Sequence, residues 1–178
     1  MAAPEPTRAR GPLGKRRRAR EMAMQMLYQY ELGGTDLDKI FASYDLESYL
    51  EEAETESDGE TASKSRKALL SRAKKSFEYA RRLVTGTLEQ RSGIDELISK
   101  YAENWRLERM PTIDRNILRL AIYEMLHESS VPKVVIVDEA IELAKKFGSE
   151  NSGRFVNGLL DGVLQSRLAS SAAQGSRN

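Results

Sequence analysis

The chain has 178 residues, with 28 Lys and Arg against 27 Asp and Glu, one histidine and no cysteine. This length favours a single domain, and the lack of cysteine excludes disulfides, thiolate nucleophiles and cysteine metal sites. No stretch approaches the roughly 18 to 20 uninterrupted apolar residues of a membrane helix, so we expect a cytoplasmic protein. Since His127 is the sole histidine and no nucleophile, base and orienting group occur together, we expect no catalysis, no cofactor and no metal.

The N-terminal part of the predicted protein combines a flexible arm with a buried helix. Residues 1–14 are rich in proline and glycine, so we expect a disordered arm. The next apolar residues follow the spacing of one helical face, and Gly33 and Gly34 then end the helix. These apolar residues are Ala19, Met22, Ala23, Met26, Leu27 and Tyr30. The same spacing predicts a second helix over 37–44, capped by Thr35 or Asp36.

The middle of the chain contains an acidic segment followed by two predicted helices. Residues 51–66 have six acids in the first ten positions and no aromatic residue, which predicts a flexible surface insertion. Helical spacing returns from Phe77 to Leu88 and again from Ile94 to Trp105, with a break at Ser92 and Gly93.

The C-terminal part contains three predicted helices. The first begins at Pro111 with Thr112 as its cap and is apolar on nearly every side, which indicates a central, buried position. The second spans about 132–147; its Val134–Val137 run also fits a strand, but no partner strands are evident, so we favour the helix. The third spans about 152–168 and is followed by a disordered tail, 169–178. The predicted fold is therefore all-α, a single domain of about seven helices.

The basic residues before the first helix are the strongest functional signal. Residues 8–20 contain seven Lys or Arg and no acid, whereas acids outnumber bases in the rest of the chain. On a helical wheel, Arg17, Arg20, Met24 and Tyr28 lie away from the apolar face, so arginines and an aromatic ring share the exposed side. This combination is typical of proteins that bind single-stranded RNA. A solvated helix end with Tyr28 at the rim of the core is the alternative.

Two further features favour structural interpretations. The basic stretch from Lys64 to Arg82 fits a solvated helix face whose positive charge balances the acidic insertion beside it. Gly158 and Gly162, four residues apart in a predicted helix, favour close approach by a neighbouring helix or a ligand.

Three segments, in order, carry a resemblance to the transcription antitermination factor NusB family: "RRRAREMAMQMLYQYEL", "IDRNILRLAIYEML" and "VPKVVIVDEAIELAKKFGSENSGRFVNGLLDGVL". The resemblance spans roughly residues 15–165, and the NusB-like domain is taken as 15–168 with the acidic insertion at 51–66. It implies an all-helical domain of two small helical bundles. It also implies a non-catalytic protein that binds boxA RNA of ribosomal RNA transcripts with the ribosomal protein NusE and modifies elongating RNA polymerase together with other Nus factors.

The resemblance also implies roles for individual residues. The predicted RNA contacts are Arg16, Arg17, Arg18, Arg20, Tyr28, Asn151, Arg154, Phe155 and Asn157. Phe155 falls about 100° off the apolar stripe of its helix, which predicts a position at the core boundary. Asp114 and Arg115 are candidates for contacts with NusE, and salt bridges within the protein are an equal alternative for both.

Other functions remain as alternatives at this stage. The same helical domain resembles the N-terminal module of a ribosomal RNA methyltransferase, but no glycine-rich cofactor motif follows it. An RNA-binding module in ribosomal RNA modification or ribosome assembly, without antitermination, is the main alternative. A DNA-binding regulator is disfavoured because no exposed recognition helix is evident. Self-association as a homodimer through the RNA surface stays open.

Overall fold

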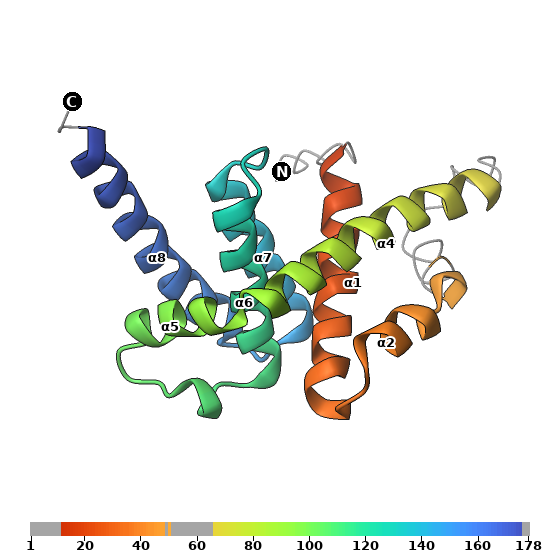
Figure 1. The fold of residues 1–178 in the computed structure, drawn as a ribbon, viewed down its shortest axis with the longest axis horizontal. Helices are drawn as coiled ribbons and strands as arrows, with labels where there is room; N and C mark the ends of the chain where they lie inside the picture. The colour runs from red at the N-terminus through yellow and green to blue at the C-terminus, as the bar shows by residue number, and fades with distance from the viewer. Residues whose placement is uncertain (1–11, 49, 51–65, 176–178) are drawn as a thin grey trace, which may run out of the picture.

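The structure is a computed structural model that describes residues 12–48, 50 and 66–175. Within these residues it is helical and contains no strand, which confirms the all-α fold class. Its elements are α1 (Pro12–Gly33), α2 (Leu37–Ser43), α4 (Arg66–Glu89), α5 (Arg91–Tyr101), the 3-10 helix η2 (Leu107–Arg109), α6 (Thr112–His127), α7 (Lys133–Phe147) and α8 (Ser152–Gly175) (Figure 1).

The two terminal helices are longer than predicted. α1 begins at Pro12 and α8 continues to Gly175, so both extend into segments that we expected to be disordered. Residues 1–11 of the predicted arm, 51–65 of the predicted insertion and 176–178 of the predicted tail lie outside the described residues.

The helices form two bundles that share α6. On one side, α1 packs against α4, α2 and α6; on the other, α7, α8 and α5 pack against α6 (Figure 1). α6 contacts α1, α4, α5, α7 and α8, so it is the central helix that the apolar sequence predicts. Ile117, Leu118, Leu120 and Ile122 of α6 are each at most 1% exposed.

The predicted apolar face of α1 is buried as expected. Met22 and Met26 are completely buried, together with most of the stripe around them. Met24, which the helical wheel placed on the lateral face, is also buried, so that prediction was wrong. The wheel fails there because α1 has neighbours on more than one side, α4 and α6.

Local sequence patterns predict some helix ends correctly and misplace others. The Asp36 carboxylate accepts a hydrogen bond from the Asp38 N–H at 3.1 Å, which confirms the predicted cap of α2. The break between α4 and α5 lies at Gln90, not at Ser92 and Gly93, which are inside α5. Thr112 is the first residue of α6 rather than its cap, because Pro111 holds the cap position.

The valine-rich segment is helical, as we favoured. α7 begins at Lys133 and ends before Gly148, which is its C-cap. Ile136 and Val137 are buried within the protein, whereas Val134 points outward and is 64% exposed. A helix with one buried face explains this division, and the short β-branched run needs no strand.

Gly158 and Gly162 of α8 differ in how closely a neighbouring residue approaches them. A Cβ at Gly162 would lie 3.3 Å from Tyr101 Cδ1, so the predicted close approach is present there. A Cβ at Gly158 would meet nothing within 4 Å, so the prediction of a neighbouring helix was wrong for Gly158.

Candidate nucleic-acid interface

The arginines of α1 begin the candidate site, and Arg17 is held in place by an acid of α7. Its Nε and Nη2 donate to Glu139 Oε2 and Oε1 at 2.9 and 2.7 Å, while its side chain stays 45% exposed. The hydrogen bond to Glu139 is the main reason why the pKa of Arg17 is raised. Arg17 is therefore an oriented cation with an accessible surface.

Arg20 differs from this pattern. Its side chain is 3% exposed, and Nε and Nη2 donate to Glu124 Oε1 and Oε2 of α6 at 2.7 and 2.8 Å. Burial lowers the pKa of Arg20, but the hydrogen bonds and charge of Glu124 outweigh it, so the pKa is raised. The prediction that Arg20 lies on the exposed face was wrong, because the arginine turns inward to a buried acid that the wheel of α1 does not show.

Among the described residues, Arg16 and Arg18, on either side of Arg17, lack the acidic partners that hold Arg17 and Arg20. The Arg16 guanidinium lies 5.9 Å from the centre of the Tyr79 ring, and its Nη2 donates to Ser130 Oγ at 3.4 Å. Within the described residues, neither Arg16 nor Arg18 forms an ion pair with an acid. Two cations at the start of α1 are thus available to an anionic ligand.

The α1 surface continues toward the start of α8 through α7. Lys146, at the end of α7, forms an ion pair with Glu21 of α1, with Nζ and Oε2 3.2 Å apart. A Cβ at Gly153 of α8 would lie 3.3 Å from Lys145 Cγ, so the first turn of α8 packs directly against the same end of α7. Tyr28, two turns after Glu21 on α1, is 38% exposed as expected.

The remaining candidate residues lie at the start of α8, with Asn151 directly before its first residue. Asn151, Arg154 and Asn157 are exposed, and Phe155 is half-buried, which confirms its predicted boundary position. The Phe155 ring meets the ring of Trp105 edge-on, with centroids 5.9 Å apart.

Trp105 is the residue that the sequence reasoning missed. We expected it to extend the apolar stripe of α5, but α5 ends at Tyr101 and Trp105 lies in the following loop, 54% exposed. An exposed tryptophan beside Phe155 offers a flat apolar face to a ligand. Asn104 and Pro111 lie near Trp105 in the sequence, and both residue types favour loops. They were the available signal that Trp105 lies outside the helix.

Asp114 is buried inside the protein. The carboxyl is 4% exposed and near Ser152, at the start of α8. Burial raises the pKa of Asp114, and a hydrogen bond with Ser152 opposes that shift. Asp114 is buried, so it does not present an accessible carboxylate to a partner.

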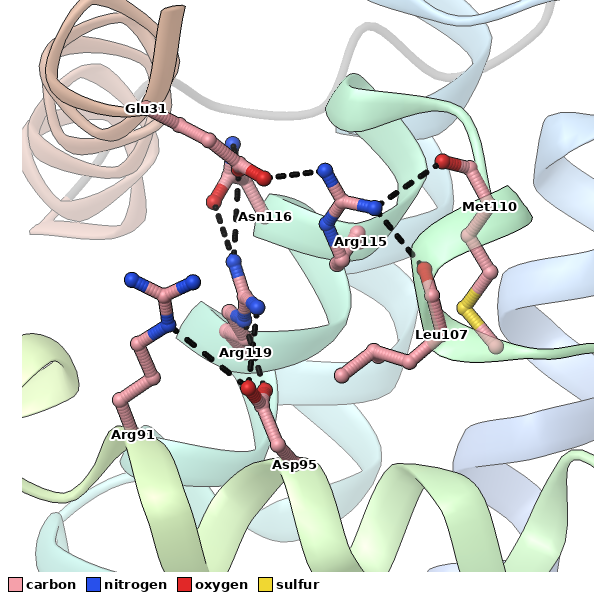
Figure 2. Close-up of polar contacts among 8 residues, drawn as sticks. All are labelled: Glu31, Arg91, Asp95, Leu107, Met110, Arg115, Asn116 and Arg119. Atoms are coloured by element: carbon pink, nitrogen blue, oxygen red, sulfur yellow. Dashed lines mark hydrogen bonds and ion pairs between the residues drawn. The ribbon is translucent and has the colours of Figure 1, made fainter. Parts of the chain in front are cut away.

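Arg115 is also held by internal contacts, at one end of a polar network that Figure 2 shows. Its Nη1 donates to the carbonyl oxygens of Leu107 and Met110 at 2.8 and 3.3 Å, and its Nη2 donates to Glu31. The alternative of a salt bridge within the protein is therefore the one that the structure shows for Arg115.

The network continues from Glu31 to α5. Glu31 Oε2 accepts from Asn116 Nδ2 at 2.9 Å and from Arg119 Nη1 at 3.3 Å. Arg119 also donates to both oxygens of Asp95 at 2.7 and 3.0 Å, and Arg91 lies 3.7 Å from the same carboxylate (Figure 2). These contacts fasten the end of α1 and the start of α5 to α6.

In the described part of the chain, no group of three or more acidic or histidine side chains is placed to hold a metal ion. No helix among the same residues is long and apolar enough to cross a membrane. His127, at the end of α6, is exposed and stacks on Tyr123 with ring centroids 4.7 Å apart.

Comparisons with known proteins agree on one family. The model of the NusB family matches residues 17–165. The transcription antitermination protein NusB of Symbiobacterium thermophilum is 42% identical over 158 residues, covering 89% of this chain and 94% of the relative. The solved structure of T. maritima NusB has a TM-score of 0.62 at 40% identity and covers 93% of each chain. A crystal structure of antitermination factors NusB and NusE in complex with dsRNA shares the fold, with a TM-score of 0.62 at 24% identity over 86% of this chain and 98% of that chain.

Proposed function

The chain belongs to the NusB family, and from this premise we propose that it is a transcription antitermination protein that binds RNA. It recognises single-stranded boxA RNA of ribosomal RNA transcripts together with NusE and makes elongating RNA polymerase resistant to termination. It does this in the cytoplasm by binding alone, without catalysis. Residues 15–168 form the functional domain.

The observation that carries this proposal is the group of three arginines at the start of α1. Arg16 and Arg18 lack an acidic partner within the described residues, and Arg17 is fixed by Glu139 with nearly half of its side chain exposed. Guanidinium groups bind phosphate oxygens with charge-assisted hydrogen bonds. The start of α1 therefore binds the RNA backbone.

Aromatic and polar groups at the other end of the surface bind the bases. Tyr28, Phe155 and Trp105 offer ring faces and edges on which unstacked bases pack. Asn151, Arg154 and Asn157 are exposed within four residues of Phe155 in the sequence and supply hydrogen-bond donors and acceptors.

Some of the candidates do not enter the proposed RNA or NusE contacts. Arg20 acts through Glu124, by fixing α1 on α6, and does not touch RNA. Asp114 and Arg115 position the start of α6. Neither is assigned a direct contact with NusE, because Asp114 is buried and Arg115 is paired with Glu31 within the protein.

The proposal is tested by removing one free arginine. We expect Arg18→Ala to weaken binding of a fluorescent boxA oligonucleotide and to make the slope of log affinity against log salt shallower by about 0.7. Lys39→Ala is the matched control, because Lys39 is an exposed cation on α2, outside the candidate surface. Equal affinities for wild type, Arg18→Ala and Lys39→Ala would contradict the assignment of α1 to the RNA.

A further inference from the structure

A second basic surface runs along α4, in the stretch that the sequence analysis treated as a solvated helix face. It borders a shallow groove of about 690 Å³, the α4 groove. The α4 groove is lined by Lys67, Leu70, Ser71, Lys74, Lys75, Glu78, Tyr79 and Arg82. Each of these residues has another three or four positions away, in the pattern i, i+3, i+4, i+7, so they share one face of the helix. From Lys67 to Arg82 this α4 groove extends for about 22 Å at the rise of an α-helix.

The cations of the α4 groove have no acidic partner among the described residues. Lys67, Lys74, Lys75 and Arg82 form no ion pair with any of the described residues. Among the described residues that line the groove, the single acid is Glu78, which is paired with Arg81 at 3.3 Å. Four cations therefore lie along one face with no net acidic compensation within the groove.

The α4 groove joins the proposed RNA surface of α1. The guanidinium groups of Arg16 and Arg82 lie over the same Tyr79 ring, 5.9 and 5.1 Å from its centre. Ser76 of α4 also donates a hydrogen bond to the Lys15 carbonyl oxygen at 3.2 Å, which fixes the two helices at this point. The cations of α1 and α4 thus form one continuous basic surface with Tyr79 at the junction.

A solvated helix face does not explain this arrangement well. Lysines that serve solubility are mixed with acids on the surface, whereas these cations share a hollowed face that leads to another cationic surface. A row of uncompensated cations along a groove is suited to the regularly charged backbone of a nucleic acid.

We infer that the α4 groove is a second RNA-binding surface, which binds the phosphate backbone of single-stranded RNA adjoining the boxA segment held by α1 and α8. This inference rests on the proposed function, because it needs RNA at Arg16. It adds that the bound RNA is longer than boxA itself and follows α4 away from the start of α1.

The test compares two RNAs and two triple variants. One RNA contains boxA alone, and the other contains boxA extended at both ends by an unstructured uridine tract. The first variant is Lys67→Ala/Lys74→Ala/Lys75→Ala. The control is Lys39→Ala/Lys100→Ala/Arg109→Ala, which removes the same charge at exposed positions outside the α4 groove.

We expect wild type and control to bind the extended RNA about tenfold more tightly than boxA alone, and the α4 variant to lose this gain. For the extended RNA, the salt slope of the α4 variant should be shallower by about 2, since each lost phosphate contact contributes about 0.7. Its affinity for boxA alone should stay within about twofold of wild type.

The outcomes separate this inference from the function on which it rests. If boxA alone binds but the extension adds nothing, or if both triple variants lose the same affinity, the α4 inference is overturned and the proposed function stands. If wild type binds boxA alone no better than a scrambled RNA, both are overturned. Circular dichroism melts of the two variants show whether either loss comes from unfolding.

Discussion

The Arg20 guanidinium of α1 and the Glu124 carboxylate of α6 form two parallel hydrogen bonds, at 2.7 and 2.8 Å, with both side chains at most 3% exposed. They join the helix that carries the proposed RNA contacts to the central helix of the fold. Breaking such a pair leaves an uncompensated charge in the interior, which is costly.

We therefore expect Arg20→Ala to lower the free energy of unfolding by about 3–5 kcal/mol, measured by urea denaturation. Arg20→Met combined with Glu124→Leu removes both charges and should recover most of that loss. If Arg20→Ala is as stable as wild type but loses RNA affinity, Arg20 contacts RNA and its structural role is refuted.

Tyr79 gives the protein a stability change at high pH. Burial is the main reason that the pKa of Tyr79 is raised to about 12, and the charges of Glu124 and Glu128 raise it further. The folded protein holds this proton more tightly than the unfolded chain, in which a tyrosine pKa is about 10. Its stabilising contribution is therefore complete below pH about 10 and is lost as the pH rises toward 12.

Tyr79→Phe removes this dependence. The Tyr79 hydroxyl makes no hydrogen bond with the described residues, so we expect little change in melting temperature at pH 7. Between about pH 10 and 12 the variant should become more stable relative to wild type. A stability difference that stays constant over this pH range would show that the phenol proton is not held more tightly in the fold.

Replacement by alanine should change the stability of the protein in opposite directions at two glycines. Gly86 of α4 is covered by the Tyr123 ring, and a Cβ there would overlap the ring and its hydroxyl, so Gly86→Ala should destabilise the protein by about 1–3 kcal/mol. Gly158 faces open space in α8, so Gly158→Ala should stabilise it by about 0.5–1 kcal/mol. Thermal melts of the two variants check both signs, and a destabilising Gly158→Ala would mean that this face of α8 is covered.

Trp105 should contribute to RNA binding with little effect on folding. Because the side chain is 54% exposed, we expect Trp105→Ala to leave the melting temperature nearly unchanged. Loss of one stacked base weakens binding by about 1–3 kcal/mol, and Trp105→Phe should recover part of it. Unchanged boxA affinity in Trp105→Ala, measured by fluorescence anisotropy, would remove Trp105 from the interface.

The fold was predictable where periodicity and caps act within one segment. The buried stripe of α1 from Ala19 to Leu27, the Asp36 cap and the helical Val134–Val137 run are all present. These features depend on residues within about four positions of one another, so the sequence contains the whole signal.

The site was less predictable because its side chains are oriented by residues far away in the sequence. A helical wheel of α1 cannot distinguish Arg17, which stays half-exposed against Glu139, from Arg20, which is buried against Glu124. Trp105 matched the spacing of α5, yet the chain leaves the helix before reaching it. The resemblance to the NusB family supplied the candidate residues, and only the tertiary contacts separate those that face solvent from those that hold the fold.

The central claim is that this chain recognises boxA RNA, and recognises it better with NusE. The most direct measurement is fluorescence anisotropy of a labelled boxA oligonucleotide titrated with the protein, alone and with NusE, beside a scrambled oligonucleotide of the same length. We predict tighter binding of boxA than of the scrambled RNA and a further gain in affinity with NusE. Equal, weak binding of both RNAs with and without NusE would contradict the claim and would leave the arginines of α1 as a solvated helix end.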